Sequence, residues 1–137
     1  WDPTVLPKVA LPPCLCQYDF HVNLKKGTLD LCAFLRSSDS FLAFMWNTTF
    51  CSIFVHVLCK LTGYKPGRLI MNTGDSHVYK NHVDQVNEQI IREPYPFPSV
   101  FISRELTKIS DIANLEVCDF NLRGYKSHPA IKGEMAV

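Results

Sequence analysis

Residues 28–36 read Thr-Leu-Asp-Leu-Cys-Ala-Phe-Leu-Arg, and this stretch decides how the first third of the chain is interpreted. Its side chains alternate with the period of two that a β-strand imposes. One face is apolar and the other is mixed: Leu29, Leu31, Ala33 and Leu35 stand against Asp30, Cys32, Phe34 and Arg36. Residues 18–24 form a second strand-like run, and Lys25-Lys26-Gly27 between the two runs suits a turn. The pattern predicts a β-hairpin.

A buried helix is expected after this hairpin. Apolar side chains recur with the i, i+3, i+4, i+7 spacing of a helix that Asn47 or Thr48 can cap and Gly63 can end. The apolar positions are Phe50, Ile53, Phe54, Val57, Leu58 and Leu61.

The rest of the chain mixes strand and helix signals. We expect a short strand over 68–72, a tight connection at 73–75, a second helix over 79–91, and strands over 100–103 and 116–122. Prolines at positions 3, 7, 12 and 13 predict an extended lead-in, because proline keeps its predecessor out of the helical region. Together these elements predict a single α+β domain over residues 1–137.

The charge balance argues against two classes of partner. Fourteen Lys and Arg residues face thirteen Asp and Glu residues, so the net charge is +1 and no broad positive field exists for a nucleic-acid backbone. The apolar stretches 41–46 and 52–58 are shorter than the ~20 residues that a membrane helix needs. We therefore expect neither a nucleic-acid nor a membrane partner.

Six cysteines stand at positions 14, 16, 32, 51, 59 and 118. Their spacing does not suit a disulfide framework, and there is no CxxC pair or histidine pair at zinc spacing. We expect reduced thiols in a cytoplasmic protein, and no metal site. The chain opens on Trp1 without an initiator Met or a leader, so we also expect it to be part of a longer protein.

A series of short motifs follows a definite order along the chain. They are Trp1-Asp2-Pro3, Leu11-Pro12-Pro13-Cys14, Arg36-Ser37-Ser38-Asp39, residues 42–47, 74–82, 92–98 and 124–129, and Met135-Ala136-Val137. In this combination and order they resemble the C-terminal half of the thymidylate synthase family, and the resemblance covers essentially the whole chain.

The resemblance implies an α+β fold with a mixed sheet packed with helices, and a homodimer formed through a sheet face. It also implies the family's reaction. A cysteine thiolate adds to C6 of dUMP, and C5 then attacks the methylene of 5,10-methylenetetrahydrofolate. The folate donates hydride, which leaves dTMP and dihydrofolate. The expected ligands are therefore dUMP and this folate cosubstrate, without a metal.

Three of the motif residues are implied to act on the reacting nucleotide. Cys14 is the expected nucleophile. Arg36 is the expected phosphate ligand and the neighbour of the sulfur, because a guanidinium favours a thiolate and its planar fork suits phosphate. Asn47 suits uracil, since one amide can donate to O4 and accept from N3–H.

Other residues are implied to complete the two ligand sites. Ser37 is expected to add a hydrogen bond to the phosphate, and His77 and Tyr79 to bind the deoxyribose 3′-hydroxyl. Asp39 and Leu42 are expected to contact the folate, with Asp39 at the pterin edge. The tail that ends at Val137 is expected to close over the bound folate.

Two cysteines compete for the role of nucleophile. The family's cysteine usually stands twenty residues before its arginine; here Cys16 is twenty and Cys14 twenty-two residues before Arg36. Cys14 is preferred because it follows the two prolines of the motif, which requires a hairpin at 23–27 that is two residues longer. Hairpin tips tolerate such insertions.

Departures from the family pattern keep two other functions open. Ala43-Phe44-Met45-Trp46 stands where the family has Gly-x-Pro-Phe beside the folate, so extra bulk could redirect the methylene to water, as in the pyrimidine-nucleotide hydroxymethylases. A non-catalytic homologue is the third reading. The family's N-terminal half, with a glutamate and two cross-dimer arginines, has no counterpart in these residues, so we expect this chain alone to be a poor enzyme.

Overall fold

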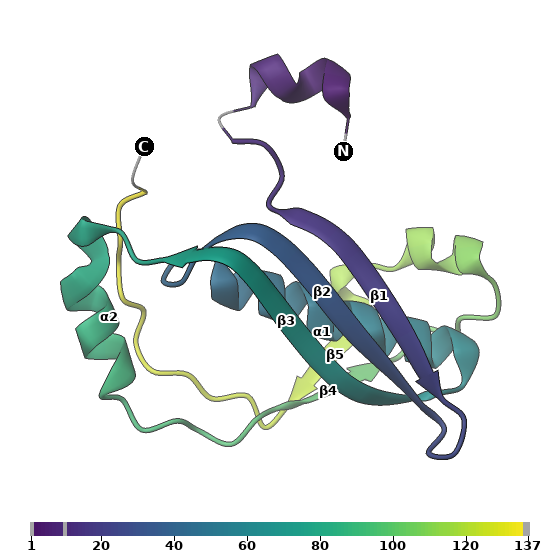
Figure 1. Ribbon diagram of the computed structural model, residues 1–137. Helices are drawn as coiled ribbons and strands as arrows, with labels where there is room; N and C mark the ends of the chain where they lie inside the picture. The colour runs from purple at the N-terminus through teal and green to yellow at the C-terminus, as the bar shows by residue number, and fades with distance from the viewer. Residues whose placement is uncertain (1, 10, 136–137) are drawn as a thin grey trace.

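Strand β2 (Thr28–Asp39) is the centre of the computed structural model, which describes residues 2–9 and 11–135 (Figure 1). Within these residues β2 pairs antiparallel with β1 (Leu15–Asn23) and parallel with β3 (Lys65–His77), so the main sheet has the order β1-β2-β3. Gly27, at φ 63°, supplies the left-handed conformation that the β1–β2 turn needs. The predicted hairpin and the α+β class are confirmed.

Helix α1 (Phe44–Thr62) forms the crossover between the parallel strands β2 and β3. It ends as predicted at Gly63, which has φ 77° and donates its N–H to the carbonyl of Cys59. It begins three residues before Asn47, so the predicted cap is wrong. The N-cap position is Ala43, and Asn47 lies inside the helix with its N–H bonded to the Ala43 carbonyl.

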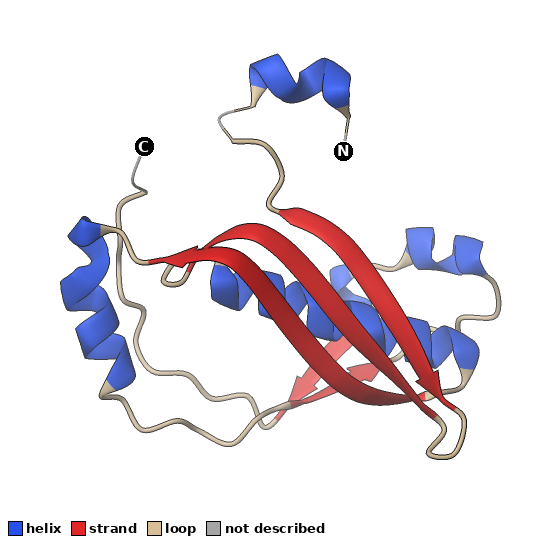
Figure 2. Ribbon diagram, viewed as in Figure 1, coloured by secondary structure: helices blue, strands red, loops and turns tan. Residues whose placement is uncertain are grey.

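Helix α1 is buried on two sides rather than one. Figure 2 shows it behind the main sheet, with the small sheet of β4 (Ser99–Ile102) and β5 (Phe120–Arg123) behind it in turn. The first side packs on Leu29, Leu31, Ala33 and Leu35 through Cys51, Val55 and Cys59, and the second packs Val57 against Ile102 and Leu106. The predicted single apolar stripe was therefore incomplete, and Phe50, expected inside, is exposed.

The length and composition of α1 would also allow it to cross a membrane. In the structure it lies between the two sheets, and its buried side chains contact strands on both sides. A core helix of this kind passes the same test of length and composition, so the test adds no evidence for a membrane.

The N-terminal segment differs from the extended lead-in predicted for it. Pro3–Lys8 form a 3₁₀ helix, η1. Asp2 caps this helix, because its Oδ1 accepts a hydrogen bond of 2.9 Å from the Thr4 N–H. Proline at the first position of a helix loses no hydrogen bond, which explains why Pro3 permits the turn.

Three later predictions need correction. Residues 73–75, expected as a tight connection, continue β3, because Thr73 and Asp75 pair with Leu35 and Ser37 of β2. The second helix is shorter than 79–91: a 3₁₀ turn η2 (Lys80–His82) leads into α2 (Val83–Ile90). The last strand is also shorter, since 3₁₀ helices η3 (Ile109–Asn114) and η4 (Val117–Asp119) precede β5.

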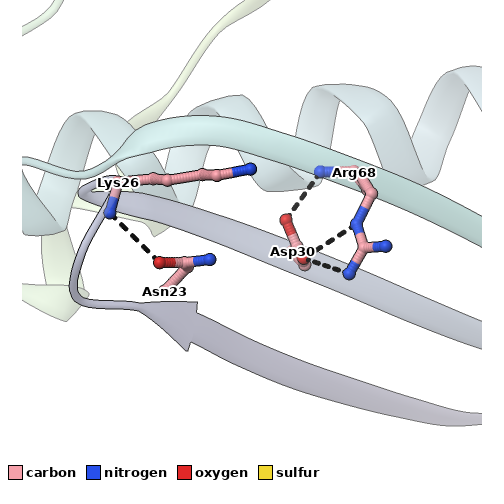
Figure 3. A network of polar contacts seen from close by, with 4 residues as sticks. All are labelled: Asn23, Lys26, Asp30 and Arg68. Carbon is pink, nitrogen blue, oxygen red and sulfur yellow. Dashed lines mark hydrogen bonds and ion pairs between the residues drawn. The ribbon is translucent and has the colours of Figure 1, made fainter.

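An ion pair between a buried carboxylate and an exposed arginine fixes the register at one end of the main sheet. Asp30, which is 8% exposed, accepts the Arg68 backbone N–H at 2.8 Å and its Nε and Nη2 at 3.1 and 3.0 Å (Figure 3). The β2–β3 register shifts here, between Leu29 and Leu31. Position 67 suits glycine, which has no Cβ, because a Cβ there would lie only 2.9 Å from the Leu29 carbonyl oxygen. The hydrogen bonds from Arg68, and then its charge, hold the pKa of Asp30 below the usual 3.8.

Replacing Asp30 with Asn tests this ion pair through pH. A carboxylate with a lowered pKa in the folded state stabilises the protein above its unfolded pKa, and this contribution disappears as pH falls through the folded value. We expect Asp30→Asn to lower the free energy of unfolding at neutral pH, and the difference from the parent to shrink below the ordinary value of 3.8. Urea unfolding across this pH range measures it.

Asp19→Asn is the matched control, because Asp19 is an exposed carboxylate on the neighbouring strand β1. It makes the same change in charge away from Arg68. A deficit for Asp30→Asn that stayed constant down to acid pH would contradict the role given to the Asp30 charge.

Candidate active site

Arg36 connects the central strand to the segment that carries Cys14. Its Nε and Nη2 donate to the carbonyls of Pro13 and Pro12, at 3.1 and 2.7 Å. The same Nη2 lies 3.8 Å from the Sγ of Cys14, and the Arg36 backbone N–H donates to the Cys14 carbonyl at 2.8 Å. The guanidinium therefore holds the prolines in place and also lies within hydrogen-bonding reach of the thiol.

Cys16 lies in a different environment from Cys14. It falls at a shift in the β1–β2 register, where Leu15 pairs with Leu35 and Gln17 with Phe34. Its side chain is exposed, and its Sγ lies 3.6 Å from the carbonyl oxygen of Cys14. Arg36 thus contacts the sulfur of Cys14, whereas the sulfur of Cys16 contacts the peptide of Cys14.

Parallel pairing brings two of the sequence motifs together. Ser37 pairs with Asp75, Ser38 with Ser76 and Asp39 with His77. Gly74 permits this close pairing, because a Cβ there would lie 2.8 Å from the Arg36 carbonyl oxygen. The residues of the phosphate motif on β2 and residues 75–77 of the sugar motif on β3 therefore lie side by side at the same end of the sheet.

His77 and Tyr79 form an aromatic pair just beyond this end. Their rings meet edge to face with centroids 5.0 Å apart. The Nδ1 of His77 also lies 3.4 Å from an Asp75 carboxylate oxygen, so a carboxylate faces the ring on its strand side. The Tyr79 ring in turn meets the His82 ring edge to face, at 6.1 Å.

Asp39 shapes the link into α1. Its Oδ1 accepts hydrogen bonds from the Phe41 and Leu42 N–H groups, at 2.9 and 3.2 Å. Leu42 borders a cavity of about 500 Å³ at the start of the helix. Other side chains around the cavity are Phe41, Met45, Trp46, Arg92, His128 and Ile131. Asn47 follows in the first turns of α1 and is half-buried.

The predicted site residues thus fall into three groups. Cys14 and Arg36 are in contact, and Ser37 and Asp39 pair with the end of β3, where His77 is the last residue and Tyr79 follows two residues later. Leu42 and Asn47 belong to the start of α1, and the hydrogen bonds of the described residues do not join the Asn47 side chain to the other groups. Val137 lies outside the described residues.

Sequence reasoning missed His82, which connects the C-terminal segment to the site. The ring is fully buried, and its Nε2 donates to the Glu134 carbonyl at 2.6 Å. It also packs on Phe41, with centroids 5.1 Å apart. Gly133 packs against this pair because glycine has no Cβ, and a Cβ there would lie only 2.6 Å from the Phe41 ring. The only signal in the sequence was the place of His82 at the end of the 74–82 motif.

The C-terminal segment runs beside α2 (Figure 1), and further contacts join it to the residues that follow this helix. The Nε2 of His128 donates to the Glu93 carbonyl at 2.8 Å, and its ring stacks on Tyr95 at 4.6 Å. Arg92 donates to the Pro129 carbonyl at 2.6 Å. The 92–98 and 124–129 motifs are therefore in contact with each other.

Comparison with known proteins agrees with this arrangement of motifs. The thymidylate synthase family model matches residues 1–137. The thymidylate synthase of Pseudomonas syringae pv. tomato is 37% identical over 145 residues, which cover 100% of this chain and 45% of that protein. The probable thymidylate synthase of Escherichia phage T5 is 39% identical over 138 residues, which cover 99% of this chain and 49% of that protein.

A chain in which Arg36 contacts the Cys14 sulfur thus has relatives that match it over nearly its full length. The chain belongs to the thymidylate synthase family. It spans about half the length of the curated relatives it matches.

Replacing His82 with Phe tests the anchor of the C-terminal segment. Phenylalanine keeps the ring but loses the N–H that binds Glu134, and one hydrogen bond is worth ~1 kcal/mol. We expect trypsin to cleave after Lys132 about fivefold faster in His82→Phe than in the parent. The digestion is carried out under native conditions, and mass spectrometry measures its rate. His56→Phe, on the half-buried histidine of α1, is the control. Equal cleavage rates in both variants would count against the anchor.

Proposed function

We propose that the protein containing this chain converts dUMP to dTMP with 5,10-methylenetetrahydrofolate. The observation that carries the proposal is the Arg36 guanidinium 3.8 Å from the Cys14 sulfur, in a chain that belongs to the thymidylate synthase family. Its relatives in Pseudomonas syringae and phage T5 carry the names thymidylate synthase and probable thymidylate synthase.

In this proposal Cys14 is the nucleophile. Its thiolate bonds to C6 of dUMP, which makes C5 nucleophilic toward the methylene carbon of the folate. Hydride from the folate then completes the methyl group, and release of the sulfur from C6 gives dTMP and dihydrofolate. Arg36 suits two tasks, because it lies beside the sulfur and its planar fork can bind a phosphate.

The remaining roles on dUMP follow from the motifs. Ser37, next to Arg36 on β2, adds a hydrogen bond to the phosphate, and the pair of His77 and Tyr79 binds the 3′-hydroxyl of the sugar. Asn47 reads uracil, because its amide can donate to O4 and accept from N3–H. The half-buried position of Asn47 supports this role, since a partly desolvated amide discriminates against a base that leaves it unpaired.

The folate is assigned to the start of α1. Asp39 uses Oδ1 to hold the turn, while its Oδ2 accepts no hydrogen bond from the described residues and can bind the pterin edge. Leu42 borders the cavity of about 500 Å³, whose walls include residues of the C-terminal segment. Anchoring of that segment by His82 supports a role for the tail, ending at Val137, in covering the folate.

The active form is proposed to be a homodimer formed through the face of the main sheet that α1 does not cover. Phe34 and Ile70 lie on this face and are 38% and 40% exposed. Full activity is proposed to need residues beyond this chain, because the relatives are about twice as long.

One observation favours a second candidate, hydroxymethylation of dUMP. Trp46 borders the cavity at the start of α1 and is 78% exposed, so a large ring stands where the folate is assigned. A shifted folate would let water capture the methylene in place of hydride. The product would then be 5-hydroxymethyl-dUMP, released with tetrahydrofolate.

Incubation of the full-length protein with dUMP and the methylene-folate separates the candidates. Chromatography should show dTMP together with dihydrofolate. Formation of 5-hydroxymethyl-dUMP with tetrahydrofolate would support the second candidate, and nucleotide binding without any product would identify a non-catalytic homologue.

The same assay tests the nucleophile. We expect Cys14→Ser to lower kcat at least about a thousandfold, because loss of a nucleophile removes the covalent route. Cys16→Ser is the matched control, two residues away, and should retain turnover. Loss of turnover in Cys16→Ser but not in Cys14→Ser would overturn the assignment.

Replacing Asn47 with Asp tests how the pyrimidine is read. A carboxyl group presents a different hydrogen-bonding pattern from the amide, and it suits the N4 amino group of cytosine. The ratio of kcat/KM for dCMP to that for dUMP should rise at least about tenfold, by analogy with sites that discriminate through paired polar groups. An unchanged ratio would remove Asn47 from the recognition of uracil.

A further inference from the structure

The sequence Cys14-Leu15-Cys16 contains a second thiol that the proposed function does not use. Cys16 is exposed, and its Sγ lies 3.6 Å from the carbonyl oxygen of Cys14. A thiol held this close to the peptide of a neighbouring cysteine raises the question of whether the two sulfurs can bond.

The backbone around these residues departs from a regular strand. In a regular strand, residues two apart have Cα atoms about 6.6 Å apart, near the upper limit for a disulfide. Here the strand is irregular, because the β1–β2 register shifts between Leu15 and Gln17 and leaves Cys16 without a partner on β2. The chain also bends at Cys14. A bulge bends its strand and re-aims the extra side chain, which agrees with the contact of Cys16 with the Cys14 peptide.

The other cysteines are poorly placed to react with Cys14. Cys51 and Cys59 are buried in the core between α1 and the main sheet. The sulfur of Cys32 accepts a hydrogen bond from Asn72 at 3.0 Å, in the middle of the sheet. Cys118 lies in η4, next to Glu116. Among the six cysteines, all of which the structure describes as free thiols, Cys16 is the one in contact with the Cys14 segment.

We propose that Cys16 is a resolving thiol, which forms a reversible disulfide with Cys14 after a peroxide oxidises Cys14. In the first step the Cys14 thiolate attacks one oxygen of hydrogen peroxide, and the O–O bond breaks. Cys14 becomes a sulfenic acid, and the other oxygen leaves as water after taking a proton. In the second step the Cys16 sulfur attacks the Cys14 sulfur, and the sulfenic oxygen leaves as water with the thiol proton.

The surroundings of Cys14 suit the first of these steps. The Nη2 of Arg36 is a charged donor within 3.8 Å of the sulfur, and thiolates beside cations are the forms that peroxides oxidise. Without a nearby thiol, a sulfenic acid proceeds to sulfinic acid, which ordinary thiols do not reduce. The disulfide with Cys16 would therefore protect Cys14 from permanent loss. This protection is separate from the proposed reaction.

Peptide mapping provides a direct test, because trypsin releases residues 9–25 as one peptide that contains these two cysteines and no other. The full-length protein is treated with limiting hydrogen peroxide, its free thiols are alkylated, and the digest is weighed by mass spectrometry. We expect most of this peptide to be lighter by two hydrogen atoms and unalkylated. Dithiothreitol should restore both alkylation sites.

Two variants complete the test. In Cys16→Ser the disulfide should be lost, and Cys14 should gain two oxygen atoms that dithiothreitol does not remove. Cys32→Ser, which removes another partly exposed thiol, should still form the disulfide. Sulfinic acid at Cys14 in the parent as readily as in Cys16→Ser, or a disulfide from Cys14 to another cysteine, would overturn the proposal. These readouts are masses, so they are independent of whether the protein makes dTMP.

Discussion

Parallel pairing between β2 and β3 is the constraint on which the rest of the structure depends. At one end the Asp30–Arg68 ion pair fixes the register, and at the other end the register sets Asp39 opposite His77. Because α1 is the crossover between these strands, its position follows from the same pairing. A slip of one residue would turn the apolar side chains of β2 away from α1 and also separate the motifs of the site. Fold and site therefore have a single structural origin.

Much of the fold could be predicted from local patterns, and the failures have physical causes. The hairpin was predictable because one face of β2 is apolar from Leu29 to Leu35 and Gly27 marks its turn. The packing of α1 was only half predictable. A helix between two sheets buries two stripes of side chains, and a single i, i+3, i+4, i+7 pattern in the sequence does not show that there are two. The extension of β3 through Gly74 was missed, since its glycine serves close strand pairing rather than a turn.

The candidate site was predictable to the extent that it depends on motif order. Counting residues left Cys14 and Cys16 open, because the register shift between Leu15 and Gln17 accounts for only one of the two residues by which the separation of Cys14 and Arg36 exceeds twenty. The contact between Arg36 and Cys14 joins residues that are 22 positions apart, and it becomes visible only in the folded chain. The role of His82 was equally hidden, since its partner is a backbone carbonyl far along the chain, and a carbonyl leaves no signature in the sequence.

The two prolines before Cys14 have a consequence for how this segment can change. Proline has no N–H, so Pro12 and Pro13 cannot extend the ladder that β1 makes with β2. Their carbonyls are bonded instead to the side chain of Arg36, which takes the place of a strand partner. A substitution at either position would add an N–H group, which needs a hydrogen-bond acceptor of its own near the guanidinium. The prolines and the arginine should therefore be exchanged together or not at all. Pro12 and Pro13 carry no reactive group, yet they control where the charge of Arg36 lies beside the Cys14 sulfur.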